Sequence, residues 1–451
     1  MEEKVDISGP VEKVMKIRGL LVAAVVFCVL AGLLYWSEHR KSDDTVKASA
    51  DTPPAILKLD SSSITKIDLK KKDAEPLVLS KGDAGQWKIV EPKPYAADQD
   101  TVSSLLSSLS PLNSERLVED KASDPKTYGL DHPAVEVEVT ENNRKTHKLL
   151  VGDDTPTGSA VYAMLAGDPR VFTMPSYTKN SVDKSLNDLR DKRLLTVNSD
   201  KISRLEVVRK GHALEFGRHK DDWQIVKPKP SRADSSEVSD LVRKLTDAKM
   251  DLAAADTKTA AAGFARGTEV ATANVTDASG VQTLRVRKDK DTYYAKSSAV
   301  EGAYKVDADL GKALDKGLED FRNKKLFDFG YSEPNKIEIH DGPKAYFLMR
   351  NASAWWSNGK KMDMDSVQSV ISKLRDLAAD KFPDSGFASP TIDVLVASED
   401  GKHTEKIQIA KSSDGYIAKR ENEPALYHVT GGSIEDLQKA AQAVKPAAAG
   451  K

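Results

Sequence analysis

The sequence predicts an α+β protein in which one N-terminal transmembrane helix is followed by three tandem, diverged copies of a mostly antiparallel sheet domain with two helices per copy. Three observations predict this fold class. A single uncharged apolar run stands near the N-terminus, at 19–36. Beyond it, characteristic segments recur at a spacing of about one domain length. Within each copy, runs of alternating apolar residues precede and follow amphipathic runs, an order typical of sheets with segregated helices.

Length and composition limit the class of protein. The chain has 451 residues, enough for two to four domains of about 100–200 residues each. Lys and Arg number 68 against 69 Asp and Glu, and no long basic stripe stands out. Nucleic-acid binding is therefore not expected. The single cysteine, Cys28, lies inside the apolar run, so the body has no internal disulfide or cysteine-rich zinc site, and no metal or cofactor is expected.

The apolar run at 19–36, GLLVAAVVFCVLAGLLYW, is predicted to be a transmembrane helix. At 1.5 Å per residue it is about 27 Å long, close to the hydrocarbon thickness of a bilayer. Lys13, Lys16 and Arg18 precede it, whereas acidic residues offset the charges that follow, which places the tail at 1–18 in the cytoplasm. We therefore predict a single-pass protein of the inner membrane, whose body is periplasmic and whose N-terminal helix contacts the lipid. A cleaved signal peptide is disfavoured because ASA, at 48–50, lies too far beyond the apolar run.

Two segments reveal the repeats. WKIVEPKP at 87–94 recurs as WQIVKPKP at 223–230, and LRDKRLL at 189–195 recurs as FRNKKLF at 321–327. Two matches in the same order and at nearly the same spacing indicate duplication of a whole domain. A weaker third copy repeats GLDHP (129–133) and GFARG (263–267) as GFASP (386–390).

The repeats set the predicted domain boundaries. The period is far too long for a solenoid unit, so each copy is expected to have its own core. A polar stretch with two adjacent prolines separates the apolar run from the first copy and is predicted to be a tether. The boundaries are a linker at 37–58, repeat domains at 59–196, 197–327 and 328–445, and a disordered tail at 446–451.

The elements of a copy follow from aligning the three. Short alternating strands come first, then a strand with a tryptophan and a turn. A helix begins at Asp98, Asp234 or Asp363, with matched apolar residues on one face. Strands with clean period-two patterns return, as at 135–139 and 392–396, and an amphipathic helix closes each copy. Because each aspartate directly precedes an amphipathic run, we expect helix caps rather than metal or catalytic sites.

The tryptophans divide into core and surface candidates. Trp87, Trp223 and Trp356 occupy the matched strand, and a matched tryptophan on an alternating strand is more often a core residue than a ligand platform. Trp355 is adjacent to Trp356, and successive side chains of a strand point to opposite faces. Trp355 is therefore the one candidate for an exposed contact surface.

The sequence shows no catalytic constellation. The eight histidines are scattered, and none has His-x-x-x-His or Glu-x-x-His spacing. No Gly-x-Ser-x-Gly turn and no phosphate-binding glycine loop is present. Residues matched between the copies are apolar, aromatic, glycine or capping types, which build a domain. We therefore expect a protein that is not an enzyme, with no catalytic residues.

Several of these features together resemble the bacterial domain-of-unknown-function 4340 family. They are the tryptophan segment at 87–92, Ala97-Asp98, YGLDHP at 128–133, VGD at 151–153 and the segment at 189–195. The first copy matches over nearly its whole length, the second over most of it with its proline lost at 263–267, and the third in outline. The resemblance implies a membrane-anchored envelope protein, because many members are encoded beside ABC-type transporters related to gliding-motility and export machinery. It implies no catalytic residues.

The expected function is a non-enzymatic, membrane-anchored scaffold or binding subunit on the periplasmic side, accessory to an ABC-type transport or export complex. The permease and ATPase components are its candidate partners. One alternative is an envelope hydrolase acting on glycan or peptide in an inter-domain cleft, which would need paired carboxylates. A second alternative is a ligand-binding protein that uses an inter-domain groove, for which Trp355 is the residue to examine.

Overall fold

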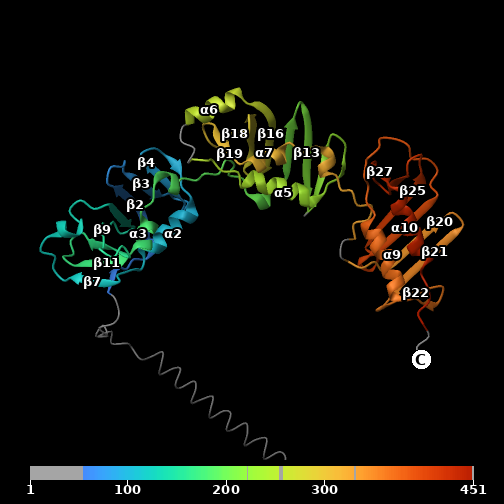
Figure 1. The fold of residues 1–451 in the computed structure, drawn as a ribbon, viewed down its shortest axis with the longest axis horizontal. Helices are drawn as coiled ribbons and strands as arrows, with labels where there is room; N and C mark the ends of the chain where they lie inside the picture. Colours follow the sequence, from blue (N-terminus) through green and yellow to red (C-terminus); the bar gives the residue numbers. More distant parts are fainter. Residues whose placement is uncertain (1–53, 221, 253–256, 330–331, 449–451) are drawn as a thin grey trace, which may run out of the picture. The chain divides into compact units, whose positions relative to one another are not determined.

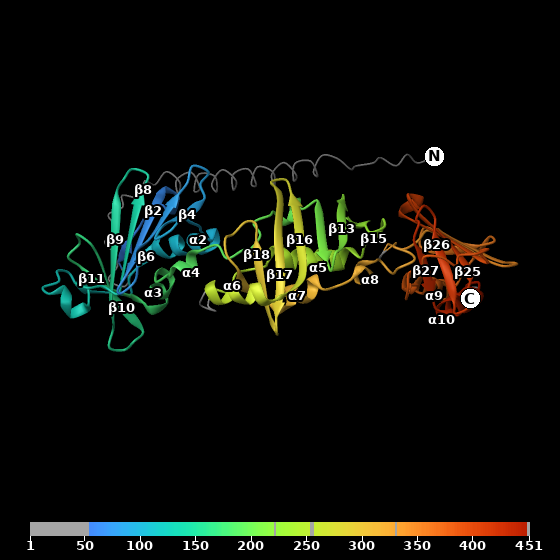
Figure 2. The same ribbon diagram turned by 90° about the horizontal axis from the view of Figure 1, so that it is seen from above.

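The computed structural model describes residues 54–448 except 221, 253–256 and 330–331 (Figures 1 and 2). The predicted transmembrane span at 19–36, the tail at 1–18 and Cys28 lie outside the described residues. Among the helices in the described part of the chain, none is long and apolar enough to cross a membrane. Contacts divide the chain after Arg190 into two compact units.

The first unit is built on a nine-stranded antiparallel sheet with the order β5-β4-β3-β2-β8-β9-β10-β11-β7. From β2 the chain steps outward to β5 on one side. It returns at β8, beside β2, and steps outward on the other side. A separate pair, β1-β6, joins Leu57 to Leu112. The strands are β1 (Ala55–Leu57), β2 (Ile64–Lys71), β3 (Leu77–Lys81), β4 (Trp87–Glu91), β5 (Tyr95–Ala96), β6 (Leu112–Asn113), β7 (Arg116–Glu119), β8 (Val135–Glu141), β9 (Thr146–Asp154), β10 (Ala160–Leu165) and β11 (Val171–Pro175).

The second unit contains two eight-stranded antiparallel sheets that repeat this order, β15-β14-β13-β12-β16-β17-β18-β19 and β23-β22-β21-β20-β24-β25-β26-β27. In each, the two halves of the chain meet at one central strand pair, as β2 and β8 do. The strands are β12 (Arg204–Arg209), β13 (His212–His219), β14 (Asp222–Lys227), β15 (Ser231–Arg232), β16 (Thr268–Asp277), β17 (Gly280–Asp289), β18 (Thr292–Ser297), β19 (Tyr304–Val306), β20 (Lys336–Asp341), β21 (Lys344–Asn351), β22 (Ala354–Ser357), β23 (Lys360–Lys361), β24 (Ile392–Ser398), β25 (His403–Lys411), β26 (Tyr416–Arg420) and β27 (Leu426–Val429).

One helix per copy connects the two halves of the sheet and covers one face of it. These helices are α2 (Gln99–Leu109), α5 (Ser235–Thr246) and α9 (Met364–Asp376). Each buries four apolar residues with the same spacing, because only positions three and four apart share one side of a helix. In all three copies, they pack against the inward-facing strand residues in a single core. The buried residues are Val102, Leu105, Leu106 and Leu109; Val238, Leu241, Val242 and Leu245; and Val367, Val370, Ile371 and Leu374.

The predicted caps are confirmed. The carboxylate of Asp98 accepts from Thr101 N at 2.9 Å, and that of Asp363 accepts from Ser366 N at 3.0 Å. Asp234 accepts from the backbone N–H groups of Ser236 and Glu237. Each aspartate thus satisfies N–H groups that have no partner within the first helical turn.

The predicted α+β class with two helices per copy is wrong, because the structure is mostly sheet. Among the described residues 42% are in strands and 24% in helices. The closing helix is broken in two in the first copies, where Ser185 and Gly317 begin new helices. An alanine-rich helix, α6, is added to the second copy. The helices besides α2, α5 and α9 are α3 (Ser176–Val182), α4 (Leu186–Leu189), α6 (Thr257–Arg266), α7 (Ala308–Leu314), α8 (Leu318–Phe321) and α10 (Gly431–Gln442), some of which Figure 2 labels beside their sheets.

Backbone pairing closes every copy at the start of its connecting helix. The capping aspartate's own N–H donates to a carbonyl in the segment that ends the copy. The distances are 2.8 Å for Asp98 to Leu189, 2.8 Å for Asp234 to Phe321, and 2.9 Å for Asp363 to Lys445. Short β-bridges flank these bonds. They are Ala97 to Arg190, Ala233 to Arg322, and Met362 to Pro446.

The repeated segments at 189–195 and 321–327 serve two cores each. Leu189 packs in the core of the first unit, whereas Leu194 and Leu195 pack in that of the second. Likewise Phe321 belongs to the core beneath β12–β19, and 326–327 belong to the core beneath β20–β27. The predicted boundaries at 196 and 327 thus lie beyond residues that already pack in the following core.

Two segments predicted to lack structure pair with their neighbours. In the predicted linker at 37–58, Ile56 and Leu57 are buried and belong to β1. In the predicted tail at 446–451, Pro446 bridges to Met362 and Ala447 N donates to Lys361 O at 2.9 Å. In the described part of each segment, these residues therefore pair with the first and third domains.

Replacing Asp363 by alanine is expected to lower the free energy of unfolding by about 1 kcal/mol, the usual effect of losing a helix N-cap. Denaturant unfolding of the full-length protein measures this. Asp365→Ala, in the first turn of the same helix but without the capping bond, is the matched control and should cost less. Equal losses for the two variants would contradict the assigned role of Asp363.

Candidate functional site

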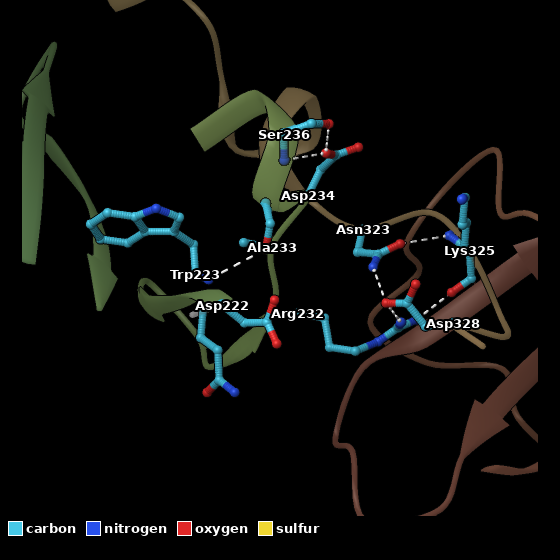
Figure 3. A pocket seen from close by; sticks show the side chains of 11 residues that line it. Asp222, Trp223, Arg232, Ala233, Asp234, Ser236, Asn323, Lys325 and Asp328 are labelled. Atoms are coloured by element: carbon cyan, nitrogen blue, oxygen red, sulfur yellow. Dashed lines mark hydrogen bonds and ion pairs between the residues drawn. The ribbon is translucent and has the colours of Figure 1, made fainter. Parts of the chain in front are cut away.

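A cavity of about 360 Å³ lies beside Trp223 in the second unit (Figure 3). Trp223 is buried, and its backbone N–H donates to Ser235 Oγ at 3.3 Å. In the first unit the equivalent Trp87 is also buried, and its N–H donates to Gln99 Oε1 at 2.8 Å. The core role predicted for both tryptophans is confirmed, and their backbone joins a strand to the start of the connecting helix.

Arg232 is one of the residues that line this cavity, where it lies beside Lys325 and Asp328 (Figure 3), and it contacts four partners in all. Its Nη1 lies 3.3 Å from Asp328 Oδ2, and its Nε lies 3.1 Å from Glu423 Oε1. Its Nη2 donates to the Lys325 carbonyl and to Tyr427 Oη, the latter at 3.4 Å. The Arg232 side chain is only 18% exposed, so its charge depends on these acceptors.

A second arginine, Arg420, belongs to the same network of ion pairs as Arg232. Arg420 lies 2.9 Å from Glu405 and 2.7 Å from Glu423. Glu405 is 4% exposed, and both its oxygens accept from Asp328 N at 2.9 Å. Burial lowers the pKa of Arg420, but the carboxylates of Glu423 and Glu405 outweigh it and hold that pKa above its usual value. The two arginines and the surrounding carboxylates thus form a network of ion pairs among themselves, which is typical of a site that stabilises the fold.

His428 makes the arrangement closest to catalytic geometry in the described part of the chain. This buried imidazole lies between two carboxylates, with Nδ1 2.5 Å from Asp380 and Nε2 3.3 Å from Asp414. The hydrogen bond from His428 holds the pKa of Asp380 below its usual value. His428 N also donates to Lys381 O at 2.9 Å. The histidine thus ties two loops to β27, a structural role.

Trp355, the predicted contact residue, is buried, and this prediction is wrong. Trp355 is 1% exposed and belongs to the third core, whereas Trp356, for which a core position was predicted, is 39% exposed, so that prediction is wrong too. Strand pairing shows why. Trp355 faces Arg350 as Trp223 faces Arg218, so Trp355 is the matched core tryptophan. The stretch between the tryptophan and the connecting helix is shorter in the third copy. Aligning Trp356 rather than Trp355 with Trp223 therefore shifts the register by one residue and assigns each tryptophan to the wrong face of the sheet.

Trp356 is instead part of an apolar patch on the outer face of the third sheet, the face opposite the helices. Phe347 and Met349, on neighbouring β21, are 42% and 57% exposed. Met349 is the direct cross-strand partner of Trp356. These three are among the eight large apolar residues that are exposed in the described part of the chain. We call Phe347, Met349 and Trp356 the outer patch.

The other two sheets carry charge on the corresponding face. In the first, Lys148 lies 3.6 Å from Glu136 and 3.3 Å from Glu138. In the second, Glu215 lies 2.8 Å from Arg204 and 2.9 Å from Lys227. Strand pairing matches the outer-patch positions Phe347, Met349 and Trp356 with Glu215, Gly217 and Gln224 in the second sheet and with Val78, Ser80 and Lys88 in the first.

No group of three His, Cys, Asp or Glu side chains in the described part of the chain is arranged to hold a metal ion. The model of the domain of unknown function (DUF4340) matches residues 87–266 and 223–393. The chain belongs to this family. No curated protein and no solved structure matched the chain.

The two DUF4340 matches begin at Trp87 and Trp223, the matched tryptophans of the first two copies. Each match continues beyond one copy into the next. The outer patch lies within the second match and was missed from sequence. The uninterrupted apolar run AYFLM at 345–349 could have indicated apolar side chains on both faces of this strand, but the run alone does not say which set faces the helices.

In this DUF4340 protein, replacing Arg232 by alanine is expected to lower the free energy of unfolding by about 1–3 kcal/mol, because it removes the cation beside Asp328 and one of the two beside Glu423. Lys229→Ala is the control, since the Lys229–Asp384 pair is exposed and should contribute nothing measurable. Denaturant unfolding of both variants measures the difference. An Arg232 variant as stable as the control would contradict the stabilising role assigned to Arg232.

Replacing Asp380 by asparagine should destabilise the protein near neutral pH by no more than about 1 kcal/mol, since Asp380 is 42% exposed. Its pKa is depressed in the folded state. The carboxylate therefore stabilises the fold above its unfolded pKa, and this contribution is lost as the pH falls through the folded-state value. Unfolding curves from pH 7 to acid pH should show the two proteins converging. A constant difference would contradict the prediction.

Proposed function

We propose that this protein is a non-enzymatic scaffold or binding subunit, attached to the inner membrane with its body on the periplasmic side and accessory to an ABC-type transport or export complex. The observation that carries the proposal is the outer patch. The first two sheets carry small, polar or buried side chains at the corresponding positions, whereas the third carries exposed aromatic and methionine side chains. Contiguous exposed apolar groups are typical of surfaces that another molecule covers.

The apolar sequence at 19–36 supports the location of the protein. The class of partner is supported by the resemblance to a family whose members are often encoded beside ABC-type transporters, so the permease and ATPase are the candidate partners. The nearly equal numbers of acidic and basic residues disfavour nucleic acid.

The described residues favour neither alternative. A hydrolase of glycan or peptide needs two carboxylates free to act on substrate, whereas Asp380 and Asp414 both contact the same imidazole. A ligand in the cavity beside Trp223 would need Arg232, whose guanidinium already has its protein partners.

Affinity purification of the full-length protein from native membranes tests the proposal. We expect the permease and ATPase of one transporter to be recovered with it. Val281→Gln, which changes a 62% exposed apolar residue on β17, should recover the same components. Recovery of the chain alone, after mild solubilisation and crosslinking, would overturn the proposal.

A further inference from the structure

A single cross-strand row crosses the outer patch. Strand pairing places Lys361 of β23 beside Trp356, Trp356 beside Met349, and Met349 beside Lys336 of β20. Directly paired side chains lie on the same face of a sheet. The row therefore presents two adjacent large apolar groups between two lysines, on four neighbouring strands.

The patch is hollowed. A cavity of about 350 Å³ is bounded by the three outer-patch residues, by Ser357 and by the turn that joins β22 to β23. That turn has Gly359 at φ 73° with no other group near the position of a Cβ. The hollow can accept a large apolar side chain against Trp356, and the flexible side chain of Met349 can adapt to its shape.

Two lysines and one carboxylate lie beside the hollow on this face. Lys336 pairs with Glu338 at 2.8 Å. In contrast, Lys361, the cross-strand neighbour of Trp356 on the edge strand β23, has no carboxylate partner among the described residues. A partner that inserts an apolar group here therefore meets an unpaired cation, and a carboxylate on that partner would be complementary.

We infer that the outer patch binds an acidic peptide segment of a partner protein, with one large apolar side chain in the hollow and a neighbouring carboxylate on Lys361. The inference rests on the proposed binding function and names the chemistry of its partner. A peptide fits this surface better than an anionic membrane, because the apolar groups line a hollow that a single side chain can enter.

Peptide selection on the full-length protein tests the inference. The probe is a displayed library of random twelve-residue peptides, followed by affinity measurements on selected synthetic peptides. We expect the selected peptides to combine Asp or Glu with a Phe, Leu or Trp. Their binding should weaken by about tenfold or more in Trp356→Gln, as for loss of an aromatic anchor. It should also weaken in Lys361→Glu, with an effect that shrinks at high salt.

Internal controls keep the test decisive. Gln and Glu occupy the positions of Trp356 and Phe347 in the second sheet, so Trp356→Gln and Phe347→Glu insert residues that this architecture already holds. Both variants should unfold cooperatively and lose peptide binding. Val281→Gln, an exposed change on another sheet, should retain it.

Three outcomes would overturn the inference. In the first, the selected peptides lack acidic residues or bind independently of Trp356. In the second, phosphatidylglycerol vesicles bind in a Trp356-dependent way and peptides do not. In the third, sedimentation velocity shows a dimer that depends on Trp356. Purification from native membranes separates this failure from that of the proposed function. If Trp356→Gln recovers the same transporter components as the wild type, the function stands and the binding surface lies elsewhere. If the wild type recovers none, the proposed function fails.

Discussion

In each copy of the domain, the backbone hydrogen bond that the capping aspartate donates joins the start of the connecting helix to the segment ending the copy. The aspartate side chain begins the connecting helix, and its own N–H is held by the carbonyl of Leu189, Phe321 or Lys445. The start of the helix, the end of the copy and the adjoining strand edge are thereby fixed at one point. The four apolar residues of the connecting helix can then face the central strand pair, where the two halves of the sheet meet.

Local features of this arrangement could be predicted from sequence because their causes are local. An aspartate before an amphipathic run caps a helix wherever the run packs, and period-two alternation marks strands such as β8 and β24. The breaks in the closing helices were not predicted. Ser185 and Gly317 begin a second short helix within what reads as one amphipathic run. The added helix α6 was hidden because the alignment placed its GFARG segment opposite a turn.

The features that bear on function depend on register and on long-range contacts, which a single sequence does not contain. Trp355 and Trp356 are distinguished only by hairpin pairing with Arg350 and Met349, and a shift of one residue exchanges core and surface. The contact of Arg232 with Tyr427 joins residues 195 positions apart. No sequence pattern around Arg232 or Tyr427 indicates this contact. The outer patch, in turn, becomes visible only when strand pairing aligns the three outer faces position by position.

The repeated segments at 189–195 and 321–327 have a consequence for how such a chain can grow or shrink. Because LRDKRLL ends one core and starts the next, and FRNKKLF does the same, the stretch of chain between these two segments contains the residues of one core. Unequal recombination between the two coding segments would remove or add one complete core and restore a repeated segment of the same pattern. Copy number can therefore change without designing a new junction, while single exposed positions diverge from one copy to another.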